Sequence, residues 1–249
     1  MKNYKITIQY DGTSYNGWQK QGNTSNTIQE KFENILTRMC GTSVEIFASG
    51  RTDAGVHAKC QVANFKCTTD LTDSEIFDYL NKYLPSDVAV TSICQVQDRF
   101  HSRLNAVSKT YEYAVSIQKP DVFLRKYVYK PEKVPDITLM QSASKKLLGT
   151  HDFVGFSSVK KTKKSTVRTI NYIEISSDNS IITIRINGTG FLYNMVRIIS
   201  GTLYEIGIGK YDESVIDEIF ETKSREKAGI TFPPNGLSLV EVNYDPDKL

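Results

Sequence analysis

Tyr4-Lys-Ile-Thr-Ile-Gln-Tyr10 is the stretch from which the fold of this chain can be worked out, because apolar and polar side chains alternate along it. Alternation with a period of two predicts a half-buried strand, and the Asp11-Gly12 pair that follows is typical of a turn. Residues 27–40 come next, with apolar side chains recurring on one helical face, a possible capping box at Thr27 and Glu30, and Gly41 at the end. A strand followed by a helix indicates a mixed α and β chain.

The same order of elements recurs in both halves of the chain. Apolar patterns and turn signals predict β-α-β-β-α-β in each half, which indicates an α+β fold of two ferredoxin-like halves with antiparallel sheets. The expected domains are residues 1–104 and residues 105–249. The strands are expected at 4–10, 44–48, 60–67, 88–96, 110–117, 167–175, 180–187 and 237–244, and the helices at 27–40, 74–84, 138–148, 191–206 and 213–220.

The charge of the chain is unevenly distributed. Its 249 residues carry 31 basic and 28 acidic side chains, a net charge of only +3. Residues 99–168, however, hold 15 basic and 5 acidic side chains, including the tract Lys160-Lys-Thr-Lys-Lys164, between two acidic flanks. Such a local excess of positive charge suits a nucleic-acid surface. Ordinary composition, interrupted apolar runs and a start without a signal region predict a globular cytoplasmic protein without a membrane span.

The cysteines and histidines give no sign of a metal site. Cys40, Cys60, Cys67 and Cys94 form no Cys-x-x-Cys pair, and the three histidines lack the spacing of metal ligands. Free thiols are therefore expected rather than zinc ligands or disulfides. Phosphate-binding loop, dinucleotide and nucleophile-elbow motifs are also missing from the sequence. These observations point away from redox chemistry and phosphoryl transfer.

Gly50-Arg-Thr-Asp-Ala-Gly-Val-His-Ala58 gathers the most residues capable of chemistry, between two expected strands. One interpretation is structural: an Asx-turn in which Asp53 bonds its own backbone and Arg51 is solvated. The other is functional: a nearby cation keeps the Asp53 carboxylate ionised for nucleophilic or base work. Composition alone favours the structural interpretation, because most such loops are only connections.

Arg197 lies in Phe191-Leu-Tyr-Asn-Met-Val-Arg-Ile-Ile199, a run that is apolar nearly all round and predicts a buried helix. A buried arginine is costly unless it meets an anion. Either its methylene stem carries the charge to the surface, or it pairs with a buried carboxylate, for which Asp53 is a candidate. Periodicity leaves both possibilities open.

Two aromatic stretches also allow two interpretations each. In Lys109-Thr-Tyr-Glu-Tyr113, alternation places Tyr111 and Tyr113 on one sheet face, either as core aromatics or as a platform for a flat ligand such as a base. The stretch from Tyr10 to Gln21 contains the single tryptophan, Trp18. Trp18 either anchors the core, or belongs to a polar segment that grips sugar and phosphate.

The loop at residues 50–58 resembles the active-site motif of the TruA family of pseudouridine synthases, and the resemblance extends in order over nearly the whole chain. Departures from the family pattern are small: Cys60 replaces the usual glycine, Ser102 a common alanine and Tyr15 a common phenylalanine. The other matching motifs are Tyr10-Asp-Gly12, Gly17-Trp-Gln-x-Gln21, Leu84-Pro85, Phe100-His-Ser-Arg103, Lys109-x-Tyr111-x-Tyr113, His151-Asp-Phe153, Gly190-Phe-Leu192, Met195-Val-Arg197 and Gly236-Leu-Ser-Leu239.

This resemblance implies the pseudouridine synthase fold, with the two sheets flanking a central cleft, and an isomerase that converts uridine to pseudouridine at positions 38 to 40 in the anticodon stem-loop of tRNA. It implies base flipping, a homodimer, and neither cofactor nor metal. Asp53 becomes the nucleophile, Tyr111 stacks on the base and can transfer a proton, and Arg197 pairs with Asp53. The residues expected to bind the substrate are Arg51, Thr52, His57, Arg103, Lys109 and Leu237.

Two other classes of function remain to be separated from this one. A non-catalytic RNA-binding protein built of paired ferredoxin-like domains would need aromatics on its central strands, yet the aromatic-glycine pattern of such modules is missing from the sequence. A structural protein would use Arg197 only in a core ion pair and would need no clustering of basic residues. Neither alternative gives Asp53 a chemical role.

Overall fold

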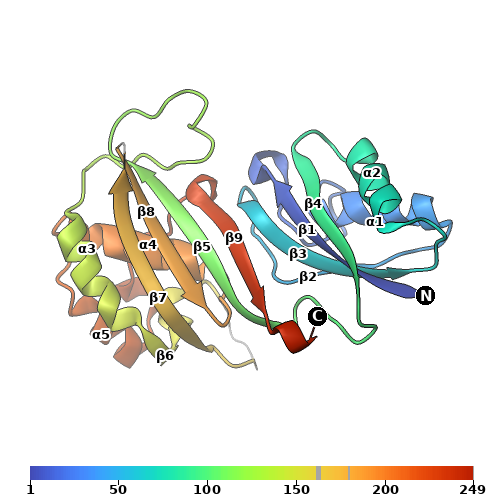
Figure 1. The fold of residues 1–249 in the computed structure, drawn as a ribbon. Helices are drawn as coiled ribbons and strands as arrows, with labels where there is room; N and C mark the ends of the chain where they lie inside the picture. Colours follow the sequence, from blue (N-terminus) through green and yellow to red (C-terminus); the bar gives the residue numbers. More distant parts are fainter. Residues whose placement is uncertain (161–163, 179, 249) are drawn as a thin grey trace. The chain divides into compact units, whose positions relative to one another are not determined.

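The computed structural model describes residues 1–160, 164–178 and 180–248, and its contacts divide the chain into two compact units (Figure 1). The first unit is Met1–Val107 with Ser238–Leu249, and the second is Ser108–Leu237. Because contacts alone do not say which segments fold independently, the domain boundary expected between residues 104 and 105 stays a prediction, as does the central cleft.

The sheet of the first unit has the strand order β4-β1-β3-β2, in which all neighbours are antiparallel. Strand β9 joins β3 through two parallel pairs, His57 with Ser238 and Ala58 with Leu239. Two helices complete the predicted β-α-β-β-α-β order. The elements are β1 Lys2–Tyr10, α1 Ile28–Cys40, β2 Ile46–Ala48, β3 His57–Cys67, α2 Asp73–Tyr83, β4 Val88–Val96 and β9 Leu237–Tyr244.

The core of the first unit follows from the register of β1 and β3. Tyr4 lies opposite Phe65, and their rings stack with centroids 5.5 Å apart. Trp18 is 2% exposed and stacks on Phe32, which confirms that it anchors the core. Helices α1 and α2, side by side in Figure 1, add their apolar faces. Their buried residues are Ile28, Phe32, Ile35 and Leu36 in α1, and Ile76 and Leu80 in α2.

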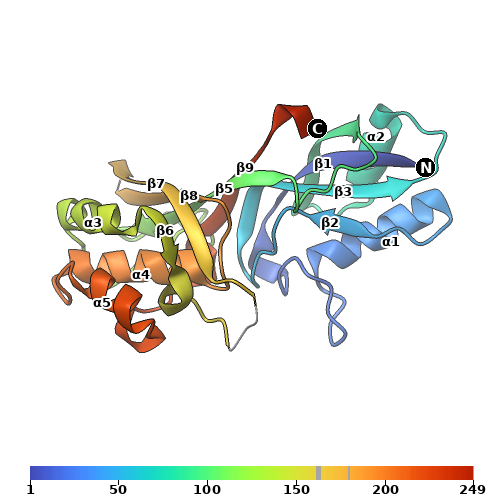
Figure 2. The same cartoon turned by 90° about the horizontal axis from the view of Figure 1, so that it is seen from below.

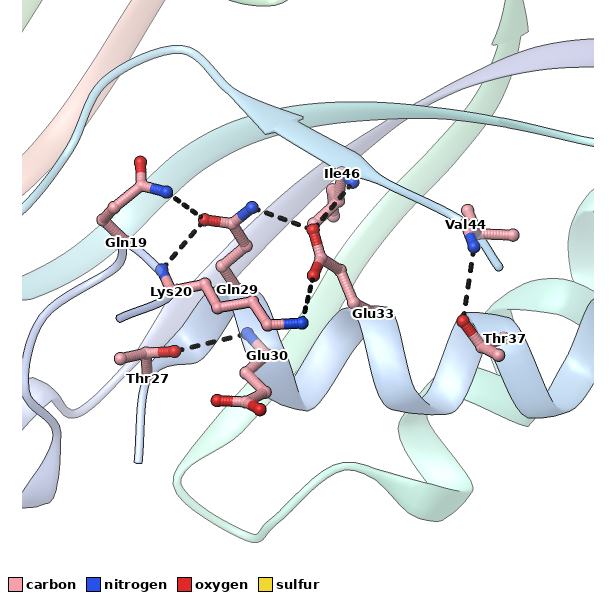
Figure 3. A network of polar contacts seen from close by, with 9 residues as sticks. All are labelled: Gln19, Lys20, Thr27, Gln29, Glu30, Glu33, Thr37, Val44 and Ile46. Atoms are coloured by element: carbon pink, nitrogen blue, oxygen red, sulfur yellow. Dashed lines mark hydrogen bonds and ion pairs between the residues drawn. The ribbon is translucent and has the colours of Figure 1, made fainter. Parts of the chain in front are cut away.

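Helix α1 is tied to its neighbours by the polar contacts in Figure 3. Gln29 accepts from the side chain of Gln19 at 2.9 Å and donates to Glu33 at 2.8 Å. Glu33 also pairs with Lys20 at 3.3 Å and accepts from the N–H of Ile46 at 3.5 Å. One polar face of α1 therefore fixes both the segment before the helix and the start of β2.

The ends of the two helices carry the expected signals. Thr27 accepts from the N–H of Glu30 in α1, and Gly41 ends that helix in the left-handed region at φ 69°. The full reciprocal capping box is formed in α2 by Thr72 and Glu75.

The second unit contains a sheet with the order β5-β8-β7-β6. The pairs β5–β8, β7–β8 and β6–β7 are antiparallel. Helix α4 packs against α3 and lies beneath β7 and β8 in the view of Figure 2. The elements are β5 Ala106–Ser116, α3 Ile137–Ser144, β6 Gly149–Asp152, β7 Val167–Asp178, β8 Ile181–Gly188, α4 Met195–Gly207 and α5 Val215–Thr222.

The expected α+β class with antiparallel sheets is confirmed, but some expected elements differ. The helix expected over residues 191–206 begins only at Met195, because Asn194 adopts the left-handed conformation at φ 61°. The strand expected over 44–48 is shorter, and β6 was not predicted. Among the residues that the structure describes, no helix has the length and apolar character needed to cross a membrane.

Candidate active site

Asp53 lies in the loop that joins β2 to β3. The main-chain carbonyl of Asp53 accepts from the N–H of Val56 at 3.1 Å, and Gly55 sits inside this tight turn at φ 78°, a conformation that favours glycine. Thr52 is buried, Asp53 is half-buried and Arg51 is exposed. A main-chain hydrogen bond therefore closes the turn that presents the Asp53 side chain.

The segment from Tyr10 to Trp18, which we call the brace, forms hydrogen bonds to this loop before and after Asp53. The N–H of Trp18 donates to the carbonyl of Thr52 at 3.0 Å. The N–H of Gly55 donates to the carbonyl of Tyr15 at 3.3 Å. The hydroxyls of Tyr10 and Thr52 share a further hydrogen bond of 2.7 Å. The residues before and after Asp53 are thus both held by one neighbouring segment.

Two glycines allow the brace to approach this closely. A Cβ atom at Gly12 would lie 2.0 Å from the carbonyl oxygen of Val56. A Cβ atom at Gly17 would lie 2.6 Å from the carbonyl oxygen of Thr52, and Gly17 has a φ of 86°. Backbone meets backbone at both points, which only glycine permits without a shift of the loop.

His57 is buried behind the loop. Its Nδ1 accepts from the N–H of Gly12 at 3.1 Å and lies 3.2 Å from Oδ1 of Asp11. The two contacts need different states of Nδ1, since it accepts from Gly12 only without a proton and donates to Asp11 only with one. In both states the ring links the brace to the start of β3. A contact between His57 and the substrate stays a prediction.

Gln61, which is not among the predicted site residues, anchors the start of the loop. Its side chain is fully buried. It accepts from the hydroxyl of Ser49 at 2.7 Å and donates to the carbonyl of Gly50 at 2.9 Å. The sequence signal for this role is a glutamine directly before the apolar run of β3. A glutamine buried there needs hydrogen-bond partners for its amide.

Replacing Tyr10 with phenylalanine should loosen this loop. Loss of its hydrogen bond to Thr52 should lower the free energy of unfolding by about 1 kcal/mol at neutral pH. Burial raises the pKa of Tyr10 to about 12 although its hydrogen bonds to Thr52 and Gln61 lower it.

This shift also predicts a dependence on pH. The unfolded tyrosine ionises near pH 10, so unfolding releases a proton between pH 10 and 12 and stability falls as the pH rises. The wild type should lose up to about 3 kcal/mol more than Tyr10→Phe in this window. Urea unfolding of both proteins from pH 8 to 12 measures the difference. Identical pH dependence would contradict the assignment.

Arg197, in the second unit, is the one residue of α4 that is not buried. Its Nε donates to the carbonyl of Phe232 at 2.6 Å, and its Nη1 donates to Oδ1 of Asn194 at 2.7 Å. The guanidinium is therefore half-buried and oriented by groups of its own unit. Pairing with Asp53, which belongs to the other unit, stays a prediction.

The segment that supplies the Phe232 carbonyl lies against α4. The N–H groups of Gly229 and Ile230 donate to the side chains of Thr202 and Glu205, at 3.0 and 3.2 Å. Phe232 N–H donates to the carbonyl of Arg197 at 3.3 Å. These bonds hold the segment where its carbonyl meets the guanidinium.

Tyr111 and Tyr113 point to one face of β5, as alternation predicts. Tyr111 is 6% exposed, with its ring edge-on to Phe191 at 5.2 Å. Tyr113 is fully buried, and its hydroxyl donates to the carbonyl of Pro233 at 2.7 Å. Burial raises the pKa of Tyr113 although the positive charge of Arg197 opposes the shift. Tyr113 is thus a core residue that links β5 to the segment beside Arg197.

The remaining expected site residues lie in both units. Arg103 is exposed in the first unit. In the second unit Lys109 is half-buried in β5 opposite Gly188, and Leu237 is buried at the start of β9. Arg51, Thr52 and Asp53 lie on one loop, and His57 begins β3 at the end of that loop. In the tract Lys160–Lys164, residues 161–163 lie outside the described residues.

Within the part of the chain that the structure describes, no group of three or more histidine, cysteine and acidic side chains could hold a metal ion. All four cysteines are free. Burial raises the pKa of Cys67 to about 12, which keeps that thiol protonated at neutral pH.

The sequence of this chain matches known proteins over nearly its whole length. The sequence profile of the tRNA pseudouridine synthase family matches residues 6–105 and 143–245. The chain belongs to this family. Among individual relatives, tRNA pseudouridine synthase A of Bacillus sp. (strain KSM-64) is 47% identical, and tRNA pseudouridine synthase A 2 of Bacillus cereus (strain ZK / E33L) is 43% identical. Each match covers 98% of this chain and 100% of the relative. The resemblance to TruA is thereby confirmed.

A solved structure, the crystal structure of a Cbf5-Nop10-Gar1 complex, also matches. The TM-score is 0.37 at 11% identity, over 95% of this chain and 48% of the other. We draw nothing from so weak a likeness.

Proposed function

We propose that this chain is an isomerase that converts uridine to pseudouridine in tRNA, at positions 38 to 40 of the anticodon stem-loop. Membership of the tRNA pseudouridine synthase family supports the reaction. The observation that carries the assignment of the site is the loop of Asp53, closed by its own turn and braced on both sides. A rigid loop of this kind suits a group that must meet a reacting atom in one geometry.

The reaction exchanges one bond of uracil for another. The bond between N1 and the ribose C1′ breaks, the base turns, and C5 bonds to C1′ while its proton leaves and N1 gains one. Atoms and charge balance without an oxidant or a metal. Asp53 can attack the sugar, attack the base or remove a sugar proton, and each route needs an ionised carboxylate.

The other residues take supporting roles in this proposal. Arg197 pairs with Asp53 and keeps it ionised. Tyr111 stacks on the flipped uracil and can pass a proton, and Leu237 lines the uracil pocket. Arg51, Thr52 and His57 hold the loop and the flipped nucleotide, while Arg103 and Lys109 contact the RNA backbone.

The distribution of charge supports RNA as the partner. The basic segment 99–168 lies between acidic flanks, and contacts to phosphates release counterions. Recognition by shape and backbone also suits an enzyme that accepts several neighbouring uridines. We further propose a homodimer in the cytoplasm, with the RNA arm contacting both subunits.

Incubation with unmodified tRNA should place pseudouridine in the anticodon arm and nowhere else. Carbodiimide modification followed by primer extension maps each site. Pseudouridine at positions 38 to 40 is the expected result, and conversion only outside the anticodon arm would contradict the choice of positions. Binding of tRNA without any conversion would favour the non-catalytic alternative. Sedimentation of the protein alone tests the dimer.

A further inference from the structure

The first unit contains a pocket outside the loop of Asp53. It has a volume of about 600 Å³ and lies beside β2, where residues of β2, β3 and the segment 98–101 meet. Among its lining residues are Phe47, Lys66, Arg99 and His101. Pockets of this size accommodate small organic groups. Strand β2 leads directly into the loop of Asp53, so the pocket and the loop are joined by one short segment of chain.

An aromatic platform forms one wall of the pocket. Phe47 is 43% exposed, an unusual position for a phenylalanine. Its ring packs against that of His101 with centroids 5.2 Å apart and planes at 42°. Nδ1 of His101 accepts from the N–H of Arg103 at 3.1 Å, so the neutral ring carries its proton on Nε2 as a donor. This hydrogen bond orients the His101 ring, on which Phe47 packs.

Buried amides anchor the segment that carries Phe100 and His101 into the pocket. Asn3 donates to the carbonyl of Phe100 at 2.9 Å, and Oδ1 of Asn64 accepts from both the N–H and the hydroxyl of Ser102 at 2.8 Å. Asn64 also donates to Asn3 at 3.1 Å. Thr37 and Glu33 of α1 accept hydrogen bonds from the N–H groups of Val44 and Ile46, just before β2 and at its start (Figure 3). The pocket is therefore built from anchored backbone.

Two cationic side chains lie at the rim of the pocket. They are Lys66 and Arg99, which lie there together with Glu45 and Asp98. Lys66 pairs with Asp98 at 2.6 Å, but the two side chains are 40% and 81% exposed. An exposed pair of this kind is weak, so an incoming phosphate can compete with Asp98 for Lys66.

We propose that this pocket binds one nucleotide of the RNA substrate, distinct from the uridine that reacts. The base stacks on Phe47, Nε2–H of His101 donates to an exocyclic oxygen or ring nitrogen, and the phosphate meets Arg99 and Lys66. An exposed aromatic beside two cations is the combination that binds unpaired nucleotides. This inference rests on the proposed function, since it takes tRNA as the ligand.

Replacing Phe47 with leucine tests the platform, because leucine keeps an apolar side chain but removes the stacking face. The matched control is Tyr83→Leu, since Tyr83 is also 43% exposed in the same unit and lies outside the pocket. Filter binding of unmodified tRNA at one salt concentration should show a Kd about tenfold higher for Phe47→Leu. The control should stay within about twofold of the wild type. Thermal melting of both variants checks that they fold.

A second measurement does not depend on affinity. Photocrosslinking of tRNA that contains 4-thiouridine should join one nucleotide to the peptide with Phe47, and Arg99→Gln should reduce the salt dependence of Kd by about one phosphate contact. Equal Kd values for Phe47→Leu, Tyr83→Leu and the wild type would overturn the proposal. If the wild type binds tRNA but forms no pseudouridine, the proposed function fails while the Kd comparison still decides the pocket.

Discussion

Replacing Asp53 with asparagine is expected to reduce pseudouridine formation on the order of 10⁴-fold or more. The amide keeps the size of the side chain but has neither the charge nor the basicity that all three routes of the reaction require. The turn around Asp53 is closed through its main-chain carbonyl, which the substitution leaves in place. The turn should therefore still form in the variant, and thermal melting checks that the protein is folded. Release of tritium from tRNA labelled at C5 of uridine measures the rate directly.

The matched control is Asp70→Asn, which removes the same charge from an exposed position in the same unit. It should keep the wild-type rate, so a loss in both variants would indicate an effect of net charge on RNA binding. A folded Asp53→Asn protein with the wild-type rate would remove Asp53 from the mechanism. A variant that fails to fold would be recognised by its melting curve and replaced by Asp53→Ser.

The elements that were predicted well are those whose signals lie in side-chain periodicity. The bounds of β4 and β9 agree with the predicted ones. Helix α1 ends just before Gly41 and α2 just before Leu84-Pro85, the residues that signal a helix end in the sequence. The start of α4 was predicted too early because Phe191 and Leu192 continue its apolar pattern, whereas the backbone turns at Asn194. A left-handed asparagine leaves no trace in hydrophobic periodicity. The short strand β6 has too few residues to show a period.

In the candidate site, too, some groups could be predicted from the sequence and others could not. Asp53, Arg197 and Tyr111 could be named because charge and aromaticity are properties of side chains. The groups that orient them are mostly main-chain atoms: the carbonyl of Thr52 for the loop and that of Phe232 for Arg197. Every residue has such a carbonyl, so no residue type marks the ones that matter. Gly12 and Gly17 belong to the N-terminal motifs, but only the structure shows what each glycine approaches.

The brace suggests why the N-terminal motif accompanies the loop motif in this sequence. The segment from Tyr10 to Trp18 gives the loop three hydrogen bonds and two close backbone contacts. A loop held this way has few alternative conformations, so the carboxylate is oriented before RNA arrives. The positions of the brace and of Asp53 are then one structural feature, and disturbing either should disturb both.

Replacing Gly12 with alanine should impair both stability and catalysis. The new Cβ atom would lie 2.0 Å from the carbonyl oxygen of Val56, so the loop and the brace must separate by at least about 1 Å to relieve the overlap. Overpacking of this kind lowers the free energy of unfolding by about 1 to 3 kcal/mol. Because a catalytic group displaced by about 1 Å loses about 10²-fold in rate, kcat at saturating tRNA should fall by that factor. Urea unfolding and single-turnover assays measure the two effects.

Gly22→Ala is the matched control, because Gly22 has open space where a Cβ would lie and belongs to the same N-terminal segment. It should change the free energy of unfolding by less than about 0.5 kcal/mol and leave kcat unaltered. A Gly12→Ala protein that is destabilised but keeps the wild-type kcat would mean that the brace stabilises the fold without orienting Asp53. A loss of kcat at a temperature where Gly12→Ala is fully folded would mean that the contact between Gly12 and Val56 sets the position of the carboxylate.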